Sequence, residues 1–196
     1  MYDLKVKLTF IESVLGLTPG DPEIYRSYIA SKAQDAATTE DEVASLGVDK
    51  VVENGMTVFP REQGEPFFYD YQVKGFFKDT CGMLRRVPAY ASSSLKNYKK
   101  VIDGLVFVFP RKIPVHYEGD IGLCERPLRA STPQGERVAL AISEEIPAGA
   151  TMEFTITCMD EKDLKLVREW LDYGYYRGLG QWRNSGKGRF LWAEVS

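Results

Sequence analysis

The sequence predicts an α+β fold in which helices cover one face of an antiparallel sheet. Residues 4–10 and residues 152–158 alternate apolar and polar side chains, the period of a strand with one buried face. An apolar helical face follows the second of these strands, and a short aromatic strand at residues 190–192 closes the chain. Strands and helices alternate at both ends of the chain, which is typical of a split β-α-β arrangement.

After the first strand the sequence predicts mostly helix. Asp21, Pro22 and Glu23 are typical of a helix start, and the helix should run to about Lys32. The acidic stretch that follows contains a second capped helix start at Thr39. We interpret residues 34–65 as a peripheral helical insertion.

The middle of the chain alternates strands with one helix. Residues 67–73 are aromatic and β-branched, which predicts a strand, and a helix should begin at Lys74 and Gly75 and end near Pro88. The apolar run 101–109 predicts another strand. Residues 111–135 are rich in Pro, Gly and Arg, which favours an extended arm or a long hairpin.

The C-terminal part has the clearest pattern. Asp160 and Asp163 are typical of a helix start, and the apolar residues up to Gly174 lie on one helical face. A glycine-rich loop separates this helix from the closing strand. With 196 residues, of which 44% are apolar, the chain can bury one core, so we expect residues 1–196 to form a single domain.

Composition limits the cellular setting. The three cysteines are widely spaced and form no C-x-x-C pair, so the sequence supports neither a disulfide framework nor a zinc knuckle. No basic leader with an apolar run begins the chain, and no apolar stretch approaches about 20 residues. We expect a cytoplasmic protein that does not contact a membrane.

Charge is unevenly distributed along the chain. The formal net charge is −3, but residues 1–71 carry 13 acids and 6 bases, whereas residues 72–137 carry 12 bases and 6 acids. An acidic block and a basic one follow, the latter being residues 173–196 with 4 bases and 1 acid. If the fold brings the two basic blocks together, they form a positive stripe that would attract a polyanion.

The most specific motif is the glycine-rich loop at residues 178–190. It carries Gly178 and Gly180, five intervening residues, and then Gly186 and Gly188, with cations and Trp182 interleaved. Glycine has no Cβ, so this pattern allows close approach either to another main chain or to a polyanion. The cations would neutralise phosphates, and Trp182 could stack on a base.

This loop resembles the C-terminal glycine-rich loop of the RAMP superfamily, the RNA-binding proteins of CRISPR systems. The first strand with the following Leu15 and Gly16, the Lys74 and Gly75 helix start with its later arginines, and the turn at 146–154 are similar to other segments of that group. The resemblance spans most of the chain outside residues 34–65, and the chain could be a solitary or phage-encoded member.

The resemblance implies a ferredoxin-like fold, similar to an RNA-recognition motif. It also implies that the chain holds single-stranded RNA, derived from a guide or a repeat, as part of ribonucleoprotein machinery for antiviral defence. Other RAMP-type subunits, or further copies of this chain, are the protein partners that it suggests. We expect these residues to contact RNA: Lys74, Lys78, Arg85, Arg126, Arg129, Gly178, Gly180, Trp182, Arg183, Gly186, Lys187, Gly188 and Arg189.

Two alternatives stay open. The chain could be a metal-independent endoribonuclease that processes structured RNA, in which His116, with Tyr117 or a loop lysine, supplies the general base and the general acid. It could instead be a phage-encoded inhibitor or assembly module that binds protein through the acidic residues 35–53. We expect binding and not chemistry, and we expect no cofactor and no metal, because the sequence has no P-loop, no G-x-S-x-G and no metal-ligand cluster.

Overall fold

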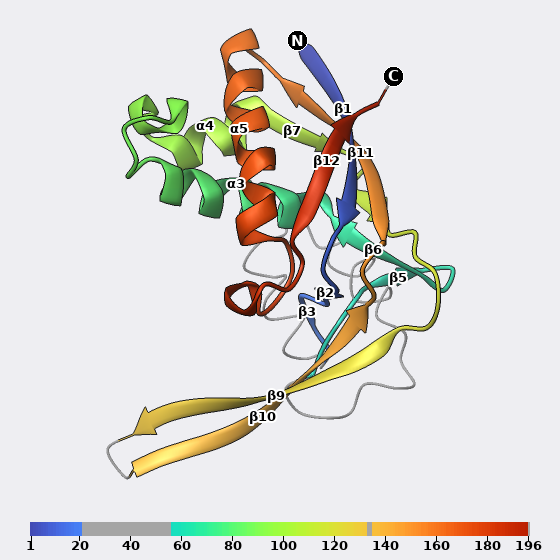
Figure 1. The fold of residues 1–196 in the computed structure, drawn as a ribbon. Coiled ribbons are helices and arrows are strands. Elements are labelled where there is room, and N and C mark those ends of the chain that lie inside the picture. The colour runs from blue at the N-terminus through green and yellow to red at the C-terminus, as the bar shows by residue number, and fades with distance from the viewer. Residues whose placement is uncertain (21–55, 133–134, 196) are drawn as a thin grey trace, which may run out of the picture.

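The computed structural model describes residues 1–20, 56–132 and 135–195, and the fold is α+β (Figure 1). Its central sheet has the strand order β12-β1-β11-β7, with β1 at Tyr2–Phe10, β7 at Val106–Phe109, β11 at Thr151–Cys158 and β12 at Phe190–Glu194. All pairs in this sheet are antiparallel. The fold class predicted from the sequence is therefore confirmed.

Two long helices complete the ferredoxin-like arrangement. Helix α3 (Asp70–Leu84) lies in the chain between β1 and β7, and helix α5 (Glu161–Arg177) lies between β11 and β12. Both cover the same face of the sheet, and their apolar sides pack against it around Trp170 and Phe77. The order β-α-β-β-α-β with the middle strands β1 and β11 is the split arrangement that the sequence predicted.

The remaining strands form two further sheets, one of five strands and one of three. A long hairpin made of β9 (Gly122–Thr132) and β10 (Gly135–Ile146) extends away from the body in Figure 1, and the foot of β10 pairs with β2 (Val14–Leu15). The shorter strands are β3 (Thr18–Pro19), β4 (Thr57–Val58), β5 (Arg61–Glu62), β6 (Glu65–Tyr69) and β8 (Lys112–Pro114). The arm or hairpin expected at 111–135 contains β8 and the first strand of this hairpin, whereas its second strand, β10, extends beyond those bounds to Ile146.

Three elements differ from the sequence prediction. Helix α3 begins at Asp70 and not at Lys74, because the Tyr69 N–H donates to the Gln72 side-chain oxygen (2.8 Å) and caps the helix one turn earlier. The predicted strand at 101–109 is a helix, α4 (Tyr98–Leu105), followed by β7. The described end of the predicted helical insertion forms β4 and β5, while its first part, and the helix expected at 22–32, lie outside the described residues.

Two further observations bear on the composition. Cys81, Cys124 and Cys158 are all free thiols, as their spacing predicted. Within the described ranges no helix is both long and apolar enough to span a bilayer.

Candidate nucleic-acid interface

The glycine loop, residues 178–189, connects α5 to β12 through a short 3-10 helix, η2 (Arg183–Ser185). Its two ends are joined by a hydrogen bond from the Leu179 N–H to the Gly188 carbonyl (2.9 Å). The Gly188 N–H donates in turn to the Ser13 carbonyl (2.8 Å), and the Gln181 N–H to the Leu15 carbonyl (3.4 Å). The loop is therefore a closed main-chain structure that is anchored on the segment around β2.

Two glycines make this closure possible. Gly188 has φ +71°, and a Cβ there would lie 1.7 Å from the Leu179 carbonyl oxygen. Gly178 has φ +75°, and its Cβ would lie 2.6 Å from the Lys187 carbonyl oxygen. The glycine pattern allowed close approach either to another main chain or to a polyanion. Gly178 and Gly188 allow the first, because each lies against main-chain atoms of the protein itself.

The three cations of the loop are each paired with an acid from another element. Arg183 Nη1 lies 2.8 Å from Asp79 of α3, Lys187 Nζ lies 2.6 Å from Glu145 of β10, and Arg189 Nη2 lies 3.2 Å from Glu12. All three side chains are only 26–34% exposed, so these pairs are half-buried. The cations thus hold the loop against three different parts of the fold, and their charge is largely neutralised.

Asp79 gives this anchoring a measurable pH dependence. Burial would raise the pKa of Asp79, but hydrogen bonds and charges from Arg177 and Arg183 lower it below its ordinary value. A depressed folded-state pKa means that the carboxylate stabilises the fold above the ordinary Asp pKa, and that this stability is lost as the pH falls through the folded-state pKa.

We therefore predict that Asp79→Asn lowers the free energy of unfolding by about 2 kcal/mol at neutral pH, the scale of hydrogen bonds to a charged group. The difference from the wild type should shrink as the solution is acidified. Urea unfolding of both proteins over a pH series measures this. A constant difference down to strongly acidic pH would contradict the assigned role of Asp79.

The helix cations that the sequence singled out lie elsewhere. Lys74 and Lys78 both face α4, where Lys74 Nζ donates to the Asp103 carbonyl (3.2 Å) and Lys78 Nζ lies 2.5 Å from the Asp103 carboxylate. Burial lowers the pKa of Lys74. Because α3 begins at Asp70, Lys74 lies in its second turn and not at the helix start that the sequence predicted. The Arg85 guanidinium packs over the Tyr98 ring at 4.9 Å.

Arg126 and Trp182 come together where the hairpin meets the loop. The Arg126 guanidinium lies 5.5 Å from the Trp182 ring and donates to the Ser143 hydroxyl (2.9 Å). Arg126 is only 7% exposed, and within the described part of the chain it pairs with no carboxylate. Trp182 is 40% exposed although its φ of +51° is strained for a residue with a Cβ. The fold thus presents an indole ring to solvent beside a buried cation. The Arg129 side chain lies outside the described residues.

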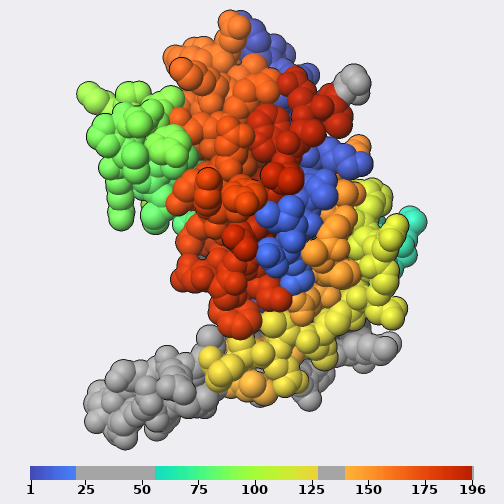
Figure 2. All heavy atoms as spheres, in the orientation of Figure 1, coloured from blue at the N-terminus to red at the C-terminus, as the bar shows by residue number. Residues whose placement is uncertain are grey.

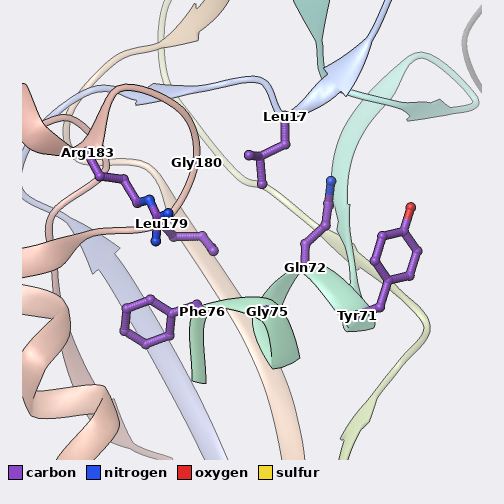
Figure 3. A pocket seen from close by; sticks show the side chains of 8 residues that line it. All are labelled: Leu17, Tyr71, Gln72, Gly75, Phe76, Leu179, Gly180 and Arg183. Atoms are coloured by element: carbon purple, nitrogen blue, oxygen red, sulfur yellow. The ribbon is translucent and has the colours of Figure 1, made fainter. Parts of the chain in front are cut away.

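A groove runs between the glycine loop and the start of α3 (Figure 3). Its volume is about 240 Å³, and it is lined by Leu17, Tyr71, Gln72, Gly75, Phe76, Leu179, Gly180 and Arg183. This is smaller than the usual range of small-molecule sites, which begins at about 300 Å³. The groove therefore suits one group of a longer chain, such as a base or a phosphodiester, better than a whole cofactor.

Gly75 stands out among the residues that line the groove. Apart from its chain neighbours and the backbone of its own helix, a Cβ on Gly75 would have no atom of the described residues within 4 Å, so packing against the described residues does not require glycine here. Glycine inside a helix costs about 1 kcal/mol relative to Ala. A helix that bears this cost at an exposed position next to a groove is well suited to close approach by a ligand backbone.

Sequence reasoning found part of this groove. It named Gly180 and Arg183, which line the groove, and it quoted Gly75 only as part of a helix start. Tyr71 and Gln72 were missed because residues 67–73 resemble a strand, which hid the helical turn that groups Gln72 with Gly75. Leu17 was missed as well, because no local sequence pattern places it beside α3. A glycine one turn inside a helix is the signal that could have found the site.

The candidate catalytic pair is not assembled as a pair. His116 is exposed and exchanges main-chain hydrogen bonds with Thr151 (2.9 and 2.8 Å), while Tyr117 packs against the core. In the described part of the chain the imidazole has no hydrogen-bond or ion-pair partner. The same residues contain no group of three His, Cys, Asp or Glu side chains that could hold a metal ion.

Comparison with known proteins gives similarity at the level of fold. No protein-family model and no curated protein matches the chain. The chain is similar to one chain of the cryo-EM structure of the Type III-B Cmr-beta bound to cognate target RNA, with a TM-score of 0.54 and 12% identity over 99% of this chain. It spans 58% of the length of that chain. A chain of a Type IV-B CRISPR complex has a TM-score of 0.48 and 12% identity, covering 100% of this chain and 91% of that one.

Proposed function

We propose that this chain is a RAMP-like RNA-binding protein that holds single-stranded RNA in the groove between the glycine loop and α3. The observation that carries the proposal is Gly75, a helical glycine that lines the groove and that packing against the described residues does not require. A ferredoxin-like fold is shared with a chain from a complex bound to target RNA, which supports the same class of ligand.

Stacking provides the second contact. Trp182 belongs to the loop that forms one wall of the groove, and its ring is exposed and backed by Arg126. Base stacking on an aromatic ring contributes about 1–3 kcal/mol per base and tolerates any sequence. The loop cations contribute less than their number suggests, because Arg183, Lys187 and Arg189 are already paired. We therefore expect this groove to bind RNA mainly by shape and stacking.

The geometry also bears on the biological setting. A groove of about 240 Å³ holds only a short part of an RNA strand, and a chain of similar fold belongs to a multi-subunit complex bound to target RNA, so we propose that the protein works within a CRISPR-type ribonucleoprotein, beside other subunits or copies of itself. No feature of the described residues favours cleavage by His116 or an inhibitor role.

The test is binding of a fluorescein-labelled polyuridine strand, followed by fluorescence anisotropy. Trp182→Ala should weaken the affinity about tenfold, and by the same factor at every salt concentration, because stacking releases no counterions. Tyr2→Ala, which removes another ring of similar exposure (41% against 40%), serves as the matched control and should leave the affinity unchanged. Absence of RNA binding by the wild type, or equal affinities for wild type and Trp182→Ala, would overturn the proposal.

A further inference from the structure

A cluster of exposed cations without acid partners lies away from the glycine loop in the described part of the chain. Residues 85–100, which we call the basic lobe, follow α3 and lead into α4, and they contain five cations and no acid. The cations are Arg85, Arg86, Lys96, Lys99 and Lys100, and all five are exposed. Figure 2 shows the lobe, in green, standing out beside α5.

None of these five cations forms an ion pair within the described residues. This separates the lobe from the glycine loop, in which every cation has an acid partner. Exposed cations repel one another, so five of them on 16 residues without an acid are unfavourable until an anion approaches. The lobe therefore offers five exposed cations that could attract an anion.

The lobe is held firmly on α5. Glu169 of α5 accepts hydrogen bonds from the main-chain N–H groups of Ala91 (2.7 Å) and Ser92 (3.1 Å), and the Ser92 hydroxyl accepts one from Trp170 Nε1 (2.9 Å). Ser92 is fully buried by these contacts. Because its main chain is fixed, the lobe presents its cations as a preformed surface and loses little entropy on binding.

An aromatic pocket adjoins the lobe. Its volume is about 350 Å³, and it is lined by Tyr90 of the lobe and by Tyr173, Tyr176 and Lys165 of α5, among others. The exposed fraction of Tyr176 is 69% and that of Tyr90 is 39%. Two carboxylates also face the pocket, but Glu169 is engaged by the lobe and Asp172 accepts from Trp192 Nε1 (2.8 Å). Lys165 has no ion-pair partner in the described part of the chain.

We propose that the basic lobe and the adjoining tyrosine pocket form a second surface for single-stranded RNA, separate from the groove beside the glycine loop. Phosphates lie on the lobe cations, and a base enters the pocket against Tyr90 and Tyr176. A nucleic acid would use both the unpaired cations, through its phosphates, and the tyrosine rings, through its bases. An acidic protein would use only the cations, so the combination favours a nucleic acid. The inference rests on the proposed function in taking RNA as the ligand.

The experiment compares salt dependence. The variant Lys96→Gln, Lys99→Gln, Lys100→Gln removes three lobe charges, and polyuridine affinity is measured by anisotropy over a range of sodium chloride concentration. Since each phosphate contact contributes about 0.7 to the log-log slope for single strands, the slope should become shallower by about 2. Tyr176→Ala should lower the affinity about tenfold with the slope unchanged.

Matched controls make the outcome decisive. The variant Lys5→Gln, Lys7→Gln, Lys162→Gln removes the same charge from other parts of the surface, and it should leave the slope close to that of the wild type. Equal salt slopes for the wild type and the lobe variant would overturn the inference. Equal changes in slope for the two triple variants would overturn it as well. The affinity of Trp182→Ala tests the groove separately, so failure of the lobe and failure of the groove can be told apart. Polyglutamate that competes as well as polyuridine would overturn the choice of RNA for this surface.

Discussion

Replacing Gly188 with alanine is expected to be the most damaging single change in the glycine loop. A Cβ at this position would lie 1.7 Å from the Leu179 carbonyl oxygen, well inside any real contact, and the neighbouring atoms are all main chain. Neither side can yield without breaking the hydrogen bonds from Leu179 to Gly188 and from Gly188 to Ser13. We expect Gly188→Ala to lower the free energy of unfolding by about 4 kcal/mol or more.

Gly149 provides the control for this change. It has φ +92°, also in the left-handed region, but none of the described residues beyond its chain neighbours has an atom within 4 Å of a Cβ there. Gly149→Ala should therefore show only the backbone strain, about 1–2 kcal/mol. Urea unfolding of the two variants separates steric overlap from strain, and a loss at Gly188 no greater than that at Gly149 would show that the loop is not closed as described.

Gly75→Leu is expected to change stability and RNA affinity in opposite directions. Leucine has a higher helix propensity than glycine by somewhat less than about 1 kcal/mol, and there is open space at the Cβ position. The variant should therefore unfold at the same or a higher urea concentration than the wild type. The new side chain would also occupy the groove that Leu17 and Leu179 help to line, so RNA should be displaced.

A second helical glycine, Gly104, serves as the control that separates blocking of the groove from a general effect of a glycine-to-leucine change on RNA affinity. Gly104 lies in α4, is exposed, and likewise has nothing within 4 Å of a Cβ. Gly104→Leu should raise or preserve stability by the same mechanism and leave the groove empty. If both variants lost RNA affinity equally, the effect could not be assigned to the groove.

The strands and the last helix could be predicted from the sequence because their patterns are local. Leu4, Val6 and Leu8 alternate with polar residues in β1, and Asp160 caps α5 with a side-chain hydrogen bond to the Lys162 N–H (3.0 Å). The glycine loop was visible for the same reason, since its four glycines stand close together in the sequence.

The start of α3 and the whole of α4 could not be predicted because neighbouring residues dominate the pattern. The aromatic run before Asp70 continues the appearance of a strand, although the Gln72 side chain already caps a helix. Tyr98, Ile102 and Leu105 are spaced as one helical face, but the apolar β7 that follows directly makes the run resemble a longer strand.

The neutralisation of the glycine-loop cations could not be predicted, because the acids that pair with them are distant in the sequence. Arg183 and its partner Asp79 are 104 residues apart, and Lys187 and Glu145 are 42 apart. The local sequence shows each cation but not the distant acid that pairs with it. The positive charge of the glycine loop is therefore overestimated from the sequence. The basic lobe, in contrast, has no acid of its own, and none of its five cations forms an ion pair with the described residues.

The most direct measurement of the central claim is a polyuridine titration of the wild type beside Gly75→Leu and Gly104→Leu, followed by anisotropy at one salt concentration. The groove account predicts that Gly75→Leu weakens binding about tenfold or more, the scale of one lost base or backbone contact, while Gly104→Leu binds like the wild type. Wild-type affinity in a fully folded Gly75→Leu would contradict it, because RNA would then bypass the groove between α3 and the glycine loop.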